Sequence, residues 1–150
     1  MYSKEEKKMV KTAISIVEKV FNRKSFDALS SPDVVKDYLK LKLSNKSIEC
    51  FGVFYLDNQN RVIDNEIISK GTIDKAQVYP REVVKSVLAM NCNAVIFYHN
   101  HPSGIAEPSA ADKYITNRCA DALSLVDVRT LDHMIIGEND VYSFAEHGLI

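Results

Sequence analysis

Two histidines separated by one residue, His99 and His101, follow an apolar run and stand directly before Pro102. Alternate residues of a strand point to the same face, so both imidazoles can reach one point at the end of such a strand. A carboxylate follows at Asp112, after the loop 102–108 and within the first turn of a predicted helix. Two imidazoles and one carboxylate are a ligand set for a catalytic zinc ion, which keeps one position open for water. The same groups also suit a non-haem iron ion, so the residues alone leave the choice between these metals open.

The three cysteines, Cys50, Cys92 and Cys119, lie far apart in the sequence and away from this cluster. Structural zinc sites normally close all four positions and often use thiolates, so a catalytic site is favoured. The cysteine count is odd and the sequence has no Cys-x-x-Cys pair. We therefore expect free structural thiols and a reducing, cytoplasmic location.

Hydrolysis at such a metal needs a base that takes a proton from water and passes it to the leaving group. Glu49 is the candidate, because it is the only acidic residue in the predicted strand 48–56. The alternative base is Glu66, on the predicted returning strand 61–69.

Several of these residues also have an ordinary structural interpretation. Ser109 and Asp112 follow a proline with the spacing of a helix capping box, in which two side chains satisfy free backbone N–H groups. The two interpretations are compatible, because a serine can cap a helix while its hydroxyl faces a pocket. Asp132 and His133 either orient a metal ligand or belong to a partly buried strand, and His147 is expected at the surface.

The length of the sequence indicates that a single domain must position these groups. The sequence has 150 residues, of which 46% are hydrophobic and 26% charged, and its net charge is −1. Such values are typical of a soluble globular protein. No apolar stretch approaches the ~20 residues of a membrane helix. The first ten residues carry charges without an apolar segment, so we expect no secretory signal.

The hydrophobic periodicity predicts an α/β fold, in which a mixed sheet has helices on both sides. An unbroken apolar run at 94–98 is typical of a strand that is buried on both faces. The expected helices are 3–23, 32–43, 79–90 and 109–125, and the expected strands are 48–56, 61–69, 94–98, 128–136 and 141–144.

Charge is unevenly distributed along the chain. Residues 1–46 carry 11 lysines and arginines against 6 acidic residues, whereas residues 47–150 carry 8 against 14. The basic segment leaves a nucleic-acid-binding accessory or repair protein open as the alternative function, and the salt dependence of DNA binding would test it. Glutamates dilute the positive charge of the first predicted helix, so we expect its charged face to be solvated.

The span 99–112 resembles the JAMM (MPN+) metalloprotease motif, which reads His-x-His-Pro, six residues, Ser, two residues, Asp. The chain matches this motif at His99, His101, Pro102, Ser109 and Asp112. The sequence His-Asn-His-Pro-Ser-Gly with a following Pro-Ser-x-x-Asp is more closely similar to the RadC family, the bacterial branch of that group. Further matching stretches extend the resemblance over roughly 32–150, and they are 54–57, 71–72, 79–82, 132–133 and 136–137.

The resemblance implies a three-layer α/β/α fold around a mixed sheet of the MPN type. Residues 31–150 would form the catalytic core of a single domain, with residues 1–30 as an added N-terminal helical extension. Longer RadC proteins carry an N-terminal helix-hairpin-helix region that suggested DNA binding. Only about 30 residues precede the resembling part, and they contain no glycine hairpin for gripping phosphates. The chain therefore resembles the short form, for which we expect a hydrolase rather than a DNA-repair factor.

The resemblance also implies a role for each site residue. One zinc ion would be bound by His99, His101 and Asp112. Glu49 would be the general acid/base that activates zinc-bound water, and Ser109 would steady the oxyanion of the tetrahedral intermediate. The implied activity is cleavage of a peptide or isopeptide bond in a peptide or protein substrate. Specificity for that substrate is expected in the loops 70–79 and 102–108.

Overall fold

A computed structural model describes residues 1–71 and 77–150 of the chain. The elements in chain order are α1 (Lys4–Phe21), α2 (Pro32–Leu43), β1 (Cys50–Leu56), β2 (Val62–Lys70), α3 (Pro80–Met90), β3 (Ala94–Asn100), α4 (Ala110–Ser124), β4 (Arg129–Ile136) and β5 (Val141–Ser143). This order confirms the predicted succession of helices and strands. The expected specificity loop 70–79 and the matching stretch 71–72 fall partly outside the described residues.

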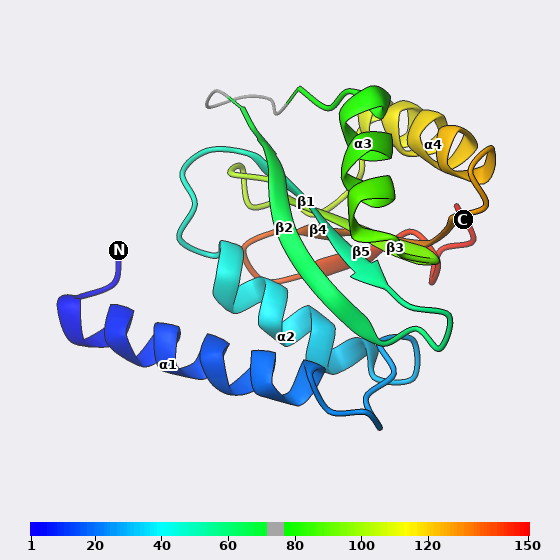
Figure 1. The fold of residues 1–150 in the computed structure, drawn as a ribbon. Coiled ribbons are helices and arrows are strands. Elements are labelled where there is room, and N and C mark those ends of the chain that lie inside the picture. Colours follow the sequence, from blue (N-terminus) through cyan, green and yellow to red (C-terminus); the bar gives the residue numbers. More distant parts are fainter. Residues whose placement is uncertain (72–76) are drawn as a thin grey trace.

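Within the described part of the chain, the strands form one five-stranded sheet with the order β2-β1-β3-β4-β5. Neighbouring strands are antiparallel except β3 and β4, which are parallel. The connection between these two strands contains α4, because parallel neighbours need a crossover segment. Figure 1 shows α1 and α2 on one side of the sheet and α3 and α4 on the other. The fold is therefore the predicted three-layer α/β/α arrangement.

The two faces of the sheet carry separate hydrophobic cores. Strands β1 and β3 are buried at every position, as expected for strands covered on both sides. The core beneath α1 and α2 includes Phe21, Tyr38, Leu39, Phe54, Ile96 and Tyr98. The core beneath α3 and α4 includes Phe51, Val53, Val83, Val87, Phe97 and Leu123. Consecutive residues of β1 and β3 thus point alternately into one core and the other.

The N-terminal helix packs against the first of these cores. The ring centroid of Phe21, at the end of α1, lies 5.0 Å from that of Tyr38 and 5.8 Å from that of Phe54. Tyr38 also donates a hydrogen bond to Glu18 of α1 at 2.8 Å. The division of the chain at residue 30 into an extension and a catalytic core stays a prediction.

Two strand ends near the predicted site differ from expectation. Strand β1 begins at Cys50 rather than at residue 48, and β3 continues to Asn100 rather than ending at residue 98. The Asn100 side chain explains the late start of β1, because it accepts a hydrogen bond from the Cys50 N–H and donates one to the Ile48 carbonyl. These groups would otherwise pair with a neighbouring strand.

None of the helices in residues 1–71 and 77–150 has both the length and the hydropathy that crossing a membrane requires.

Gly52 on β1 provides a test of how β1 and β3 pack against each other. A Cβ atom at this position would overlap the ring of Tyr98 on β3. We expect Gly52→Ala to lower the free energy of unfolding by about 1–3 kcal/mol, the usual cost of overpacking a core. Urea denaturation of Gly52→Ala, Tyr98→Leu and the double variant measures the coupling between the two positions. The double variant should lose less than the sum of the single changes, and strict additivity would contradict the proposed overlap.

Candidate metal centre

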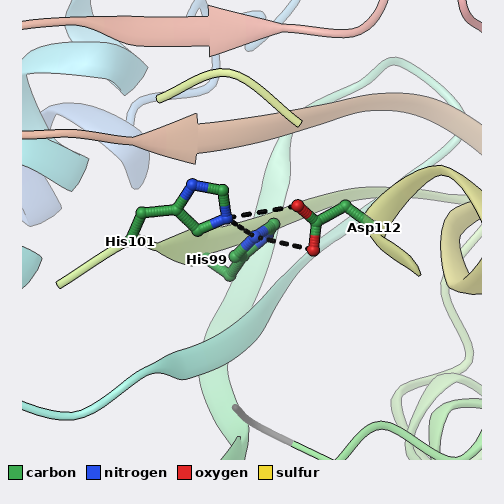
Figure 2. Close-up of side chains that lie close together, drawn as sticks. All are labelled: His99, His101 and Asp112. Carbon is green, nitrogen blue, oxygen red and sulfur yellow. Dashed lines mark hydrogen bonds and ion pairs between the residues drawn. The ribbon is translucent and has the colours of Figure 1, made fainter. Parts of the chain in front are cut away.

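The three predicted metal ligands lie together at the carboxyl end of β3 (Figure 2). His99 belongs to β3, His101 follows that strand directly, and Asp112 lies in the first turn of α4. His99 Nε2 lies 2.8 Å from His101 Nε2 and 3.4 Å from Asp112 Oδ1. His101 Nε2 lies 3.2 Å from Asp112 Oδ2. Ligand atoms of all three residues thus fall within 4.8 Å of one another, a spacing that can hold a metal ion.

The hydrogen bonds around this cluster fit a cation. His101 Nδ1 lies 2.7 Å from the carbonyl oxygen of Ile105, which can only accept, so Nδ1 carries the proton. A neutral His101 therefore turns an unprotonated Nε2 towards His99 and Asp112. Lone pairs of nitrogen and oxygen held this close repel one another unless a proton or a metal ion lies among them. The residues present therefore fit zinc, which binds imidazole and carboxylate ligands in catalytic sites.

Asp112 is held in its ionised form. Burial would raise the pKa of its carboxyl group, but the adjacent rings of His101 and His99 hold that pKa well below its usual range. Burial also works against a charged His101, yet hydrogen bonds with Asp112 and Ile105 outweigh it and raise the pKa of His101. A carboxylate that is already ionised is ready to bind a metal.

The start of α4 aims the Asp112 carboxylate at the histidines. The backbone N–H of Ser109 donates to Asp112 Oδ2 at 2.8 Å, and the Asp112 N–H donates to Ser109 Oγ at 3.1 Å. The structure thus shows the predicted capping box. The same carboxylate that caps the helix also faces the histidines, so its structural interpretation does not compete with metal binding.

The cluster opens into a cavity of about 750 Å³, which Glu49 and Ser109 also line. The lining of this cavity also includes the apolar side chains of Phe51, Val78 and Ile115. Glu66 lies elsewhere on β2, where its carboxylate accepts a hydrogen bond from the hydroxyl group of Tyr55 at 2.6 Å. The placement therefore favours Glu49 over Glu66 as the base, while the roles of Glu49 and Ser109 stay predictions.

Asn100 holds the segment that carries Glu49, and the sequence reasoning missed it. Its side chain is 4% exposed and accepts a hydrogen bond from the Cys50 N–H at 2.8 Å. The same side chain donates to the carbonyl oxygen of Ile48 at 3.1 Å. These contacts secure the backbone on both sides of Glu49, just before β1. The available signal was an amide between two histidines on a buried strand, where its side chain must point to the opposite face.

The loop 102–108 orients His101 through the carbonyl of Ile105. This loop lies against Gly137, where a Cβ atom would come within 2.9 Å of the Ala106 backbone nitrogen. The close approach explains why a glycine follows β4 at this point. A side chain there would displace the backbone next to the carbonyl that His101 donates to.

Behind the ligands lies a buried layer formed by His133 on β4 and Thr116 on α4. His133 Nε2 lies 2.7 Å from His99 Nδ1, and His133 Nδ1 lies 2.6 Å from Thr116 Oγ1. Burial lowers the pKa of His133 well below its ordinary value, and the neighbouring His99 adds to this effect. Of the two interpretations open for His133, the contact with His99 favours that of a group orienting a ligand. His147 lies outside this layer, where its ring stacks on Tyr142 with centroids 3.9 Å apart.

A mixed sheet between two helix layers, with a histidine and aspartate cluster at the end of a central strand, is the arrangement of a JAB/MPN-like domain. The model of the RadC-like JAB domain family matches residues 29–149. The chain belongs to this family, which confirms the resemblance seen in the sequence.

Curated relatives are similar over most of this chain. The UPF0758 protein of Vibrio vulnificus (strain YJ016) is 57% identical over 124 residues, which are 83% of this chain and 55% of the relative. The UPF0758 protein of Pseudoalteromonas translucida (strain TAC 125) is 59% identical over 121 residues, which are 81% of this chain and 54% of the relative. The chain therefore spans about half the length of the curated relatives it matches.

The role of Asn100 can be tested by Asn100→Ala. The change leaves the Cys50 N–H and the Ile48 carbonyl without their buried partner, which should cost about 1–3 kcal/mol in the free energy of unfolding. Amide hydrogen exchange at Cys50 should accelerate together with this loss. Asn93→Ala is the matched control, because the Asn93 side chain is exposed and has no hydrogen bond within the described residues. Unchanged exchange at Cys50 would show that Asn100 does not hold this segment.

Proposed function

We propose that the protein is a zinc-dependent metallohydrolase that cleaves an amide bond, either peptide or isopeptide, in a peptide or protein substrate. The observation that carries the proposal is the convergence of His99, His101 and Asp112 at one cavity. Two further residues with suitable chemistry, Glu49 and Ser109, line the same cavity. Membership of the RadC-like JAB domain family supports a hydrolytic centre at this place in the fold.

The division of labour follows from the chemistry of the residues. A zinc ion held by the two histidines and Asp112 would lower the pKa of a bound water to about 7 and polarise a substrate carbonyl. Glu49 then takes the proton from the attacking water and returns it to the amine as the amide bond breaks. Its position just before β1, held by Asn100, keeps this carboxylate at the cavity wall.

Ser109 is suited to stabilise the oxyanion. Its Oγ accepts a hydrogen bond from the Asp112 N–H at 3.1 Å. Within the described residues its own O–H proton has no acceptor, so the hydroxyl can donate to a substrate oxygen. Hydrogen-bond donors placed where negative charge develops lower the barrier of acyl transfer.

The cavity wall indicates what kind of substrate fits. Phe51, Val78 and Ile115 offer an apolar surface beside the three ligands. An apolar side chain next to the scissile bond would bury surface there and gain binding energy. We therefore propose a peptide segment with an apolar residue at this position as the substrate.

Elemental analysis of protein purified without added metal tests the choice of metal. We expect close to one zinc ion per chain, removable by a chelator, and zinc-dependent cleavage of a mixed peptide library followed by mass spectrometry. Bound iron in place of zinc would contradict the zinc hydrolase and would favour a reaction of molecular oxygen at a non-haem iron ion. Bound zinc without cleavage of any amide would contradict the hydrolase.

Glu49→Gln tests the base. The change keeps the size of the side chain but removes its ability to accept a proton, so turnover should fall by about 10²–10⁴. Zinc content should stay unchanged, because Glu49 is not one of the proposed ligands. Glu66→Gln is the matched control and should retain turnover. If Glu66→Gln is the variant that loses activity, the base has been assigned to the wrong glutamate.

Ser109→Ala tests the oxyanion donor. Loss of one such donor typically lowers turnover by about 10²–10³, while zinc should stay bound. The change also removes a helix cap, which costs about 1 kcal/mol of stability. Ser3→Ala controls for this loss, because Ser3 forms the same capping box at the start of α1, away from the cavity. Loss of zinc in Ser109→Ala would overturn the assigned role.

A further inference from the structure

His99 is connected to the interior by a chain of three short contacts. Its Nδ1 lies 2.7 Å from Nε2 of His133, and the other nitrogen of His133 lies 2.6 Å from Thr116 Oγ1. The Thr116 hydroxyl in turn lies 2.6 Å from the backbone carbonyl oxygen of Asp112, one helical turn earlier. This series of contacts therefore begins and ends at proposed metal ligands.

The carbonyl oxygen sets the direction of the first hydrogen bond. A carbonyl can only accept, so the Thr116 hydroxyl donates its single proton to Asp112. Thr116 Oγ1 is then an acceptor for His133, and His133 Nδ1 must carry a proton. With the opposite direction, two oxygen atoms would face each other at 2.6 Å without a proton between them.

The second and third bonds follow from the first. A neutral imidazole has one N–H, so His133 Nε2 is unprotonated and accepts from His99 Nδ1. His99 in turn has its proton on Nδ1 and an unprotonated Nε2. This is the nitrogen that faces Asp112 and His101 and that a metal ion needs.

The surroundings of His133 keep this arrangement in place. The side chain is fully buried, and its ring centroid lies 4.8 Å from Phe144, 5.5 Å from Phe51 and 5.9 Å from Phe97. Aromatic rings on these sides hinder a flip of the imidazole, and burial keeps bulk water from replacing its partners. His133 can therefore hold one tautomer of His99 only if its own Nδ1 proton has an acceptor, and Thr116 supplies it.

We propose that Thr116 and His133 are positioning residues, which hold His99 in the tautomer that binds the metal through Nε2. Metal-binding histidines usually donate their other N–H to a carboxylate, a carbonyl or water. Here the acceptor is a neutral imidazole, so the buried layer of His133 and Thr116 adds no charge. Asp112 then supplies the only negative charge among the ligands. The inference rests on the zinc site proposed above.

We call the series of hydrogen bonds from His99 through His133 and Thr116 to the Asp112 carbonyl the relay. The matched pair Thr116→Val and Thr116→Ser tests this relay through zinc affinity. Valine has nearly the same shape without the hydroxyl, whereas serine keeps it. Competition with a chromophoric chelator should show zinc binding weakened about 10–100-fold in Thr116→Val, the usual effect of losing an outer partner of a metal ligand. Thr116→Ser should bind zinc almost as tightly as the unchanged protein. Equal affinities for the two variants would overturn the proposal.

The ¹⁵N chemical shifts of the histidine rings provide a readout that does not depend on zinc or activity. In the metal-free protein at mildly alkaline pH, His133 should show the Nδ1–H tautomer, and Nδ1 of His99 should carry a proton. In Thr116→Val, His133 should lose this preference, and Thr116→Ser should restore it. An Nε2–H tautomer of His133 in the unchanged protein would overturn the relay, even if Thr116→Val failed to fold. Failure of the unchanged protein to bind zinc would instead contradict the proposed function, and the ring shifts would still decide the relay.

Discussion

The alternation of side chains at the buried end of β3 is the constraint on which the whole site depends. Because β3 is covered on both faces, His99 must enter one core and Asn100 the other. His99 thereby meets α4 and β4, which supply Asp112 and His133. Asn100 meets the segment before β1 and holds the backbone beside Glu49. One strand end therefore orients a proposed ligand and, independently, the proposed base.

Polar groups at such a depth are stable only when they are paired, since an unpaired buried group costs free energy. Asp132 illustrates the solution, because it accepts hydrogen bonds from the Ser143 hydroxyl and from the N–H groups of Ala145 and His133. Among the buried side-chain nitrogen and oxygen atoms of the described residues, only Thr130 Oγ1 is left without a hydrogen-bond partner. The site is thus supported by a nearly complete network, which favours one arrangement of its rings over alternatives.

Much of the site could be predicted from local spacing. The step from His99 to His101 and the capping pair of Ser109 and Asp112 lie close in sequence, so strand and helix geometry place them directly. Asn100 and Thr116 could not be found in this way, because their partners come from elements far away in the chain. The fold class followed from periodicity, whereas the start of β1 depended on a side-chain contact that no periodicity reports.

The double use of Asp112 has a consequence for how the metal and the fold depend on each other. The same carboxylate satisfies the Ser109 N–H at the helix start and faces the two histidines. A metal ion that binds there acts on a group that is already fixed by the helix cap, so little conformational entropy remains to be lost on binding. In turn, an ion bound only in the folded state stabilises that state by mass action. Under the proposed function, the start of α4 and the metal centre are therefore one cooperative unit, and the polar layer of Thr116 and His133 links this unit to the sheet.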